Sequence, residues 1–155
     1  MAALRPSRIL EIGTAVGYSS LLMCRVMPED CRITTIEKYE KRIPEALEHF
    51  KKAGEEGRIT LLAGDADDLL AGLKGQLFDL VFMDAAKGQY LHWLPMILEL
   101  MPDGGVLISD NVLQDGDIVE SRFAVERRNR TIHSRMRRYL YELKHRKGLE
   151  TASSP

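Results

Sequence analysis

The stretch Arg8-Ile-Leu-Glu-Ile-Gly-Thr-Ala-Val-Gly-Tyr-Ser-Ser-Leu21 decides the fold of this chain. Its apolar beginning, residues 9–12, is typical of a buried β-strand, and helix-type periodicity starts only after the two glycines. We therefore expect a strand over residues 8–13, a turn that contains Gly13 and Gly17, and a helix over residues 18–27.

The glycine turn is typical of a place where a small polar ligand lies across the end of a strand. Glycines keep side chains out of the way, and the N–H groups of the following helix point toward the ligand. The spacing Glu-x-Gly-x-x-x-Gly differs from the dinucleotide fingerprint, which disfavours a nucleotide-dependent oxidoreductase. Glu11 is expected at the mouth of the pocket, where it favours a cationic ligand group. The alternative is that Gly13 and Gly17 only make a tight turn.

Length and composition indicate one globular domain over residues 1–155. The chain is 45% hydrophobic and 29% charged, which disfavours disorder, and it has no apolar run long enough to span a membrane. No secretory signal precedes the first strand, so we expect a cytoplasmic protein without a membrane partner. Cys24 and Cys31 are expected to be unbridged thiols.

The charge is unevenly distributed along the chain. Residues 122–147 hold ten Lys and Arg against two Glu, a balance of +8 that leaves −9 for the remainder. This segment favours an anionic partner, and the alternative is a solvated helix face.

Strand and helix patterns alternate along the chain, which predicts βαβ units and an α/β fold with a parallel sheet. Strands are expected over residues 8–13, 32–37, 58–64, 78–83 and 106–109. Helices are expected over residues 18–27, 41–53 and 90–101, and a further helix begins in the turn at residues 64–68. A long last helix is expected after a loop that contains Gly116. The last helix is expected to bury the apolar stripe Ile132, Met136, Tyr139, Leu140 and Leu143.

Glu37 ends the second strand, 24 residues after Gly13. An acidic side chain at this place lies beside the glycine turn and accepts hydrogen bonds from both hydroxyls of a ribose. The alternative is a carboxylate that interacts with the dipole of the next helix.

Asp84 follows the fourth strand, and Asp110 and Asn111 follow the fifth. Parallel strands bring these oxygen ligands to the same edge of the sheet, with no His or Cys at ligand spacing. Such a set suits a hard octahedral ion, so Mg²⁺ is favoured over Zn²⁺. The alternative is that each Asp is only a helix cap.

Five segments together resemble a known family: residues 11–19 (Glu-Ile-Gly-Thr-Ala-Val-Gly-Tyr-Ser), Glu37, residues 64–66 (Gly-Asp-Ala), residues 83–90 (Met-Asp-Ala-Ala-Lys-Gly-Gln-Tyr) and residues 109–112 (Ser-Asp-Asn-Val). They resemble the metal-dependent O-methyltransferases that use S-adenosylmethionine (SAM), the group of catechol and caffeoyl-CoA O-methyltransferases. The resemblance implies a Rossmann-like, doubly wound class I methyltransferase sheet with strand order 3-2-1-4-5. It also implies SAM and Mg²⁺, or another divalent cation, as cofactors.

The resemblance also implies roles for individual residues. Glu11, Gly13 and Ser19 would line the methionine part of SAM, Glu37 would hold the ribose, and Asp65 and Ala66 would border the adenine. The other implied cofactor contacts are Thr14, Ala15, Gly17, Tyr18, Lys38, Gly64 and Asp84. The implied metal ligands are Asp84, Asp110 and Asn111. Lys87 would be the catalytic base beside Asp84, and its alternative is a surface lysine.

The acceptor substrate is suggested by finer features. Ala86 stands where catechol enzymes carry a tryptophan, and residues 126–130 (Glu-Arg-Arg-Asn-Arg) resemble the bacterial enzymes that methylate 5-hydroxyuridine in tRNA to 5-methoxyuridine. In that interpretation Arg127, Arg128 and Arg130 meet RNA phosphates and Tyr90 stacks on a splayed base. The alternative for Tyr90 is that it stacks on nothing. The alternatives are a methyltransferase of small phenolic hydroxyls and a non-catalytic module that binds SAM or RNA.

The chain departs from the family at both ends. Family members carry helices before the first strand and two further strands after the last helix, so the resemblance implies a domain truncated at both ends. The fifth strand, residues 106–109, would then be an unpaired apolar edge. We expect the protein to form a homodimer there or to bind SAM poorly.

Overall fold

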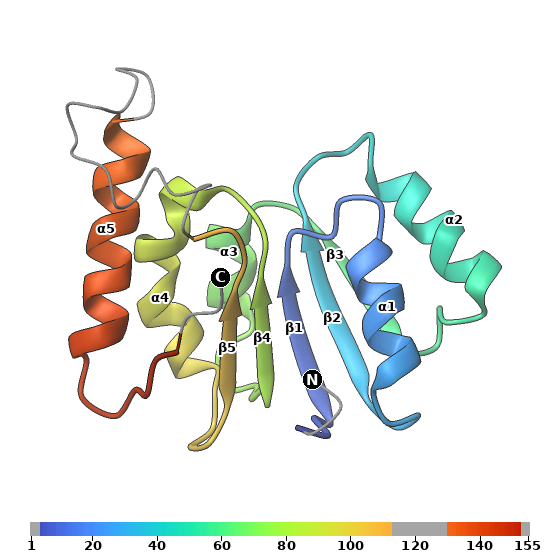
Figure 1. Ribbon diagram of the computed structural model, residues 1–155. Coiled ribbons are helices and arrows are strands. Elements are labelled where there is room, and N and C mark those ends of the chain that lie inside the picture. The colour runs from blue at the N-terminus through green and yellow to red at the C-terminus, as the bar shows by residue number, and fades with distance from the viewer. Residues whose placement is uncertain (1–3, 113–129, 153–155) are drawn as a thin grey trace. The chain divides into compact units, whose positions relative to one another are not determined.

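The computed structural model describes residues 4–112 and 130–152. The chain forms two compact units, one from Met1–Ala85 with Pro95–Asp110 and the other from Ala86–Leu94 with Asn111–Pro155. The elements of both units are labelled in Figure 1.

The first unit is built on a parallel sheet with strand order β3-β2-β1-β4-β5, which confirms the expected fold class. The strands are β1 (Arg8–Ile12), β2 (Arg32–Glu37), β3 (Ile59–Ala63), β4 (Leu80–Met83) and β5 (Val106–Ser109). The order reverses between β1 and β4, and open α/β sheets bind ligands outside the carboxyl ends of the strands at such a reversal. The fold therefore predicts a ligand site at the carboxyl ends of β1 and β4.

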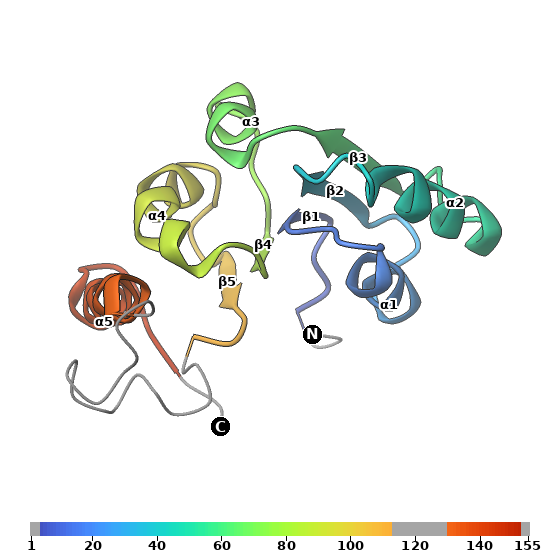
Figure 2. The ribbon, with the colours of Figure 1, turned by 90° about the horizontal axis from the view of Figure 1, so that it is seen from above.

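Helices cover both faces of this sheet. α1 (Tyr18–Val26) and α2 (Ile43–Ala53) lie on one face, and α3 (Ala66–Gly72) lies on the other (Figure 2). Right-handed crossovers place α1 and α2 together, because the chain runs outward from β1 to β3 and then returns to β4. Pro44 sits in the first turn of α2, and Gly54 ends that helix with φ 71°.

The core of the first unit lies along β1, whose last four residues are buried. Such burial is typical of a central parallel strand that has helices on both faces. Cys24 and Cys31 lie in this core and are not bonded to each other, as the sequence predicted.

Element boundaries differ slightly from the sequence-based ranges. β1 ends at Ile12 rather than Gly13, α1 ends at Val26, α2 begins at Ile43 rather than Lys41, β3 covers Ile59–Ala63, and β4 begins at Leu80 rather than Phe78. Phe78 is buried although it lies before β4. Its apolar character therefore extended the strand that was expected from the sequence.

The second unit contains the turn η1 (Lys87–Gln89), the start of α4 (Tyr90–Glu99) and α5 (Arg130–His145). Its core is aromatic: the Tyr90 ring lies edge-on to Tyr139 at 5.6 Å between centroids and tilted against Trp93 at 6.4 Å.

The buried face of α5 differs from the expected stripe. Met136 and Tyr139 are buried as predicted, but Ile132 is exposed and His133 is buried in its place. Neither ring nitrogen of His133 has a hydrogen-bond partner among the residues that the structure describes. The prediction followed hydrophobicity, whereas the packing of the helix decides which residues face inward.

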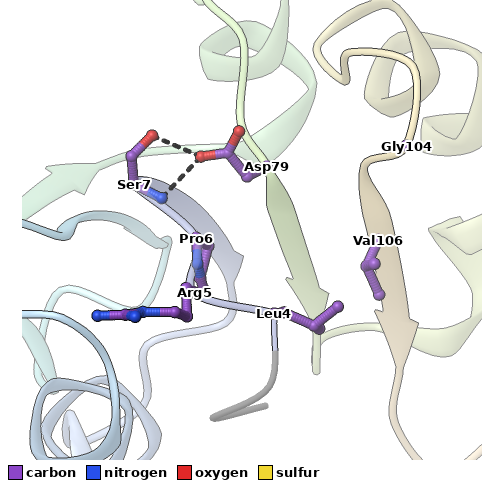
Figure 3. A pocket seen from close by; sticks show the side chains of 7 residues that line it. All are labelled: Leu4, Arg5, Pro6, Ser7, Asp79, Gly104 and Val106. Atoms are coloured by element: carbon purple, nitrogen blue, oxygen red, sulfur yellow. Dashed lines mark hydrogen bonds between the residues drawn. The ribbon is translucent and has the colours of Figure 1, made fainter.

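A hollow of about 250 Å³ lies at the amino ends of β1, β4 and β5 (Figure 3). Its lining residues are Leu4, Arg5, Pro6, Ser7, Asp79, Gly104 and Val106. Ligands of such sheets bind at the opposite end of the strands, so this hollow is not the candidate functional site.

Asp79 ties the start of β1 to the start of β4. Its Oδ2 accepts hydrogen bonds from the Ser7 hydroxyl at 2.6 Å, the Ser7 N–H at 2.8 Å and the Arg8 N–H at 2.9 Å. These hydrogen bonds, the Ser7 hydroxyl first, hold the pKa of Asp79 below its ordinary value. The carboxylate therefore stabilises the fold in its ionised form.

We expect Asp79→Asn to lower the free energy of unfolding at pH 7 by about 1 kcal/mol, because the amide is a weaker acceptor. A depressed folded-state pKa contributes stability above the unfolded pKa of about 3.9, and this is lost as the pH falls through the folded pKa. The loss should therefore shrink below about pH 4. Urea unfolding from pH 2 to 7 measures this. Asp103→Asn, at an exposed turn carboxylate, is the control, and equal losses in both variants would contradict the assignment.

The edge strand β5 pairs only with β4 among the described residues, and its four side chains are half-buried. The expected homodimer at this edge stays a prediction. None of the helices within residues 4–112 and 130–152 has the length and apolar character needed to cross a bilayer.

Candidate cofactor and metal site

The turn after β1 lies against the end of β4. The N–H groups of Gly13 and Thr14 both donate to the Ile36 carbonyl, at 3.0 and 3.1 Å. Gly13 has φ +108°, and a Cβ at this position would be 2.0 Å from the carbonyl oxygen of Asp84. Gly13 is thus required for close approach of the two strand ends, where sequence analysis had considered only the ligand or the turn.

Glu11 is completely buried, which corrects the expectation that it lies at the pocket mouth. Its carboxylate accepts hydrogen bonds from the hydroxyls of Ser19, Ser20 and Thr35. Burial raises the pKa of Glu11, and the three hydroxyl donors oppose that rise. Since its oxygens are occupied by protein hydroxyls, Glu11 here holds the start of α1 to β1 and β2.

The hydrogen-bond partners of Glu11 were not predicted from the sequence. Thr35 lies directly opposite Glu11 in the β1–β2 register, and its hydroxyl also contacts that of Thr14 at 2.6 Å. The available signal was a buried acid in one strand with a hydroxyl residue in the next, but strand register is not readable from the sequence. His49 also contacts the glycine turn, and its Nδ1 lies 2.8 Å from the Val16 carbonyl oxygen.

Glu37 is buried at the end of β2, beside the glycine turn, where the sequence placed it. Its carboxylate accepts hydrogen bonds from the N–H groups of Ala15 and Tyr39, both at 2.7 Å. Ala15 has φ 47°, a conformation that non-glycine residues rarely adopt. Two backbone donors fix the carboxylate in place, so its remaining acceptor capacity has a defined direction.

The end of β3 completes this side of the site. The Gly64 N–H donates to the Glu37 carbonyl at 2.9 Å, and Asp65 caps α3 by accepting from the Asp67 N–H at 3.0 Å. Lys38 forms an exposed ion pair with Asp65 at 2.5 Å. The Lys38 hydrogen bond, followed by that of Asp67, lowers the pKa of Asp65. Ala66 is buried as the first residue of α3.

Gly17 and Tyr18 begin α1. Gly17 has φ +85°, and a Cβ there would be 2.5 Å from the Phe50 ring. The Tyr18 side chain is 75% exposed, so it is accessible for contact with a ligand above the turn. The glycine turn, Glu37 and Asp65 therefore lie at the carboxyl edge of this sheet, and their role in cofactor binding stays a prediction.

Asp84 and Asp110 occupy neighbouring strand ends in the first unit. Met83 and Ser109 are paired in the β4–β5 ladder, and each acidic residue directly follows one of them. The Asp84 N–H donates to the Ile12 carbonyl at 3.0 Å, and the Asp110 N–H donates to the Met83 carbonyl at 2.9 Å. Both residues are exposed, so two carboxylates lie at the edge of the sheet where the sequence placed them.

Asn111 directly follows Asp110 and has φ 50°. Asparagine is enriched among the rare residues that adopt this left-handed conformation, and such outliers gather at ligand sites. The chemistry of the two carboxylates and one amide suits Mg²⁺. No cluster of three or more His, Cys, Asp or Glu suited to a metal occurs within residues 4–112 and 130–152, and the metal role of Asp84, Asp110 and Asn111 stays a prediction.

The remaining predicted residues belong to the second unit. The Lys87 Nζ lies 3.3 Å from the Tyr90 hydroxyl. The Tyr90 ring is fully buried, which corrects the prediction that it stacks on an RNA base. Arg130 begins α5, while Arg127 and Arg128 lie outside the described residues.

Comparison with known proteins agrees with this geometry. The family model described as O-methyltransferase matches residues 3–147. The chain belongs to the O-methyltransferase family. A catechol O-methyltransferase of Niastella koreensis is 33% identical over 115 residues, which cover 72% of this chain and 52% of the relative.

Solved structures of O-methyltransferases share the fold. TomG from Streptomyces achromogenes, in complex with SAM, has a TM-score of 0.83 and 30% identity, over 94% of this chain and 65% of that one. A Bacillus cereus O-methyltransferase in complex with SAH has a TM-score of 0.83 and 28% identity, over 94% and 66%. This O-methyltransferase family chain spans about half the length of the curated relatives it matches.

Proposed function

We propose that the chain carries the cofactor and metal site of a SAM- and Mg²⁺-dependent O-methyltransferase whose acceptor is a uridine hydroxyl in RNA, such as 5-hydroxyuridine of tRNA. One observation carries the proposal: the glycine turn of β1, the fixed Glu37 carboxylate and the two acidic strand ends share one edge of the sheet. This edge combines the polar groups that a ribose-containing methyl donor needs with oxygen ligands for a cation.

The first-unit residues would bind and orient the methyl donor. SAM, when bound, supplies an electrophilic methyl group on sulfur. Glu37 would accept hydrogen bonds from the ribose hydroxyls, because its carboxylate is already held by two backbone N–H groups. Asp65 and Ala66 would border the adenine. Exposed Tyr18 would cover the donor from the side of α1.

The acidic strand ends would hold the cation and the acceptor. A divalent cation, when bound, lowers the pKa of the acceptor hydroxyl and orients its oxygen. Asp84, Asp110 and Asn111 provide the hard oxygen ligands that such a cation prefers. Lys87, three residues after Asp84, would accept the proton of the acceptor hydroxyl.

The RNA acceptor is supported by the charge of α5 and the segment that follows it. Arg138, Lys144, Arg146 and Lys147 are all exposed, and no ion pair joins them to another residue in the described part of the chain. Cations without an ion-pair partner, in the helix and just after it, are available to neutralise phosphates. An acidic remainder of the chain makes this segment the attractive surface for an anionic polymer.

An exposed aromatic residue lies among these cations. Tyr141 is 60% exposed and stacks on His145 at 4.0 Å between centroids, with 23° between the rings. Aromatic side chains next to basic residues are the usual platform for unpaired bases. We therefore assign to Tyr141 the stacking role that the sequence had suggested for Tyr90.

The test is methyl transfer from labelled SAM to two acceptors: an RNA hairpin with 5-hydroxyuridine in its loop, and catechol. We expect transfer to the hairpin, none to a matched hairpin with uridine, and loss of transfer after EDTA treatment. Arg138→Ala should raise KM for the hairpin and reduce the salt dependence of binding, since one phosphate contact is removed.

Two outcomes would contradict the proposal in different ways. Turnover of catechol without hairpin methylation would favour a small phenolic acceptor, a reaction class named for several relatives. Binding of SAM or RNA without transfer to either acceptor would identify a non-catalytic binding module.

A further inference from the structure

We propose that Arg135 and Tyr90 are positioning residues that together hold Lys87 in place, Arg135 through the main chain and Tyr90 through the side chain. The inference rests on the proposed function, in which Lys87 accepts the proton. All of the contacts that support it lie within the second unit.

The main chain that carries Lys87 forms one short turn directly before α4. η1 is a three-residue 3₁₀ turn, in which the Gln89 N–H donates to the Ala86 carbonyl at 2.9 Å and the Tyr90 N–H donates to the Lys87 carbonyl. Short 3₁₀ turns have poorer hydrogen-bond geometry than an α-helix, so their position depends on outside contacts.

α5 provides such a contact. The guanidinium of Arg135 donates a hydrogen bond to the Gly88 carbonyl at 3.2 Å, across 47 positions of sequence. A donor that carries a charge makes this bond stronger than a neutral one. α5 is 16 residues long and packs through Met136 and Tyr139, so it is a firm support for the turn.

Tyr90 restrains the other end of the lysine. The Lys87 Nζ donates to the Tyr90 hydroxyl at 3.3 Å and lies 5.4 Å from the centre of its ring. The ring itself is fixed by Tyr139 and Trp93. Because the Tyr90 ring is buried among other aromatic rings, its hydroxyl gives the flexible lysine side chain a preferred position.

Position matters for a proton acceptor. A base must lie within hydrogen-bond reach of the proton it removes, and a displacement of about 1 Å lowers the rate by up to about 100-fold. Loss of either contact should therefore reduce kcat while substrate binding is retained. Loss of Arg135 is thus expected to lower kcat. Loss of Arg138, whose side chain is proposed to contact RNA, is expected to raise KM instead.

The experiment compares Arg135→Ala, Arg135→Lys, Arg138→Ala and Tyr90→Phe in the full chain. Hydrogen exchange of the peptide over residues 86–94 reports on the turn without any need for activity. We expect Arg135→Ala to increase exchange at residues 86–90 by about fivefold, the value of one hydrogen bond, and Arg138→Ala to leave it unchanged. Arg135→Lys keeps one donor and should restore part of the protection.

Kinetics then test the catalytic consequence. Arg135→Ala and Tyr90→Phe should each lower kcat about tenfold with KM for the RNA hairpin unchanged, whereas Arg138→Ala should change KM alone. Tyr90→Phe keeps the ring, so thermal unfolding checks that the fold is retained.

Unchanged exchange in Arg135→Ala would overturn the proposal whatever the activity. Increased exchange with unchanged kcat in all variants would overturn the positioning role. If wild-type protein transfers no methyl group and Arg135→Ala still increases exchange, the proposed function fails while the hold of Arg135 on the turn is supported.

Discussion

Replacement of Gly13 by alanine is expected to destabilise the first unit by about 3 kcal/mol or more and to abolish binding of S-adenosylhomocysteine. The added Cβ would be 2.0 Å from the Asp84 carbonyl oxygen and 2.8 Å from its carbonyl carbon. Both are main-chain atoms of a central strand end, so relief requires β1 and β4 to separate at the candidate site. Chemical denaturation measures the first effect and titration calorimetry measures the second.

Gly75→Ala is the matched control for this variant. Gly75 also has a positive φ, +89°, but a Cβ there would meet nothing within 4 Å. Gly75→Ala should lower the free energy of unfolding by only about 1 kcal/mol, the cost of alanine in the left-handed conformation, and should leave ligand binding intact. Equal destabilisation by the two variants would show that backbone conformation, and not the approach of β1 to β4, makes Gly13 necessary.

Removal of the proposed cation, or of one of its proposed ligands, is expected to have the largest effect on catalysis. EDTA treatment and Asp110→Asn should each reduce methyl transfer by about 1,000-fold, because the acceptor hydroxyl loses several kcal/mol of charge stabilisation. Affinity for S-adenosylhomocysteine should remain, since the proposed ribose contact is made by Glu37, at the end of β2. Mg²⁺ added back after EDTA should restore activity to wild-type protein only.

Asp68→Asn, at an exposed carboxylate of α3, is the control for Asp110→Asn and should retain activity and Mg²⁺ binding. Mg²⁺ titrations of both variants separate a ligand role from a general loss of negative charge. Full activity of wild-type protein in EDTA would refute the metal role of Asp84, Asp110 and Asn111.

Much of the fold was predictable because short stretches of sequence determine its strands and turns. The apolar run before Gly13, the acidic end of β2 and the strand ends at Asp84 and Asp110 each follow from short-range periodicity and turn chemistry. The strand order 3-2-1-4-5 came from the family resemblance rather than from periodicity, and the structure confirms it.

The errors concerned side-chain burial rather than elements. Glu11 and Tyr90 are both polar residues in motifs, and a ligand contact was predicted for each of them. The structure buries both, one under three hydroxyls and the other among aromatic rings. Arg135 was counted only as one charge of a basic segment, yet it binds the Gly88 carbonyl.

The sequence alone determined the α/β class, the acidic residue at the end of β2 and the strand ends that carry the proposed metal ligands. These features depend on residues close together in the chain, where spacing translates directly into a strand, turn or helix. Only the tertiary structure decided that Gly13 is needed for contact with β4, that Glu11 is internal and that α5 holds the turn of Lys87. Each of these depends on contacts between distant segments, and strand register and helix rotation set such contacts without leaving a local pattern.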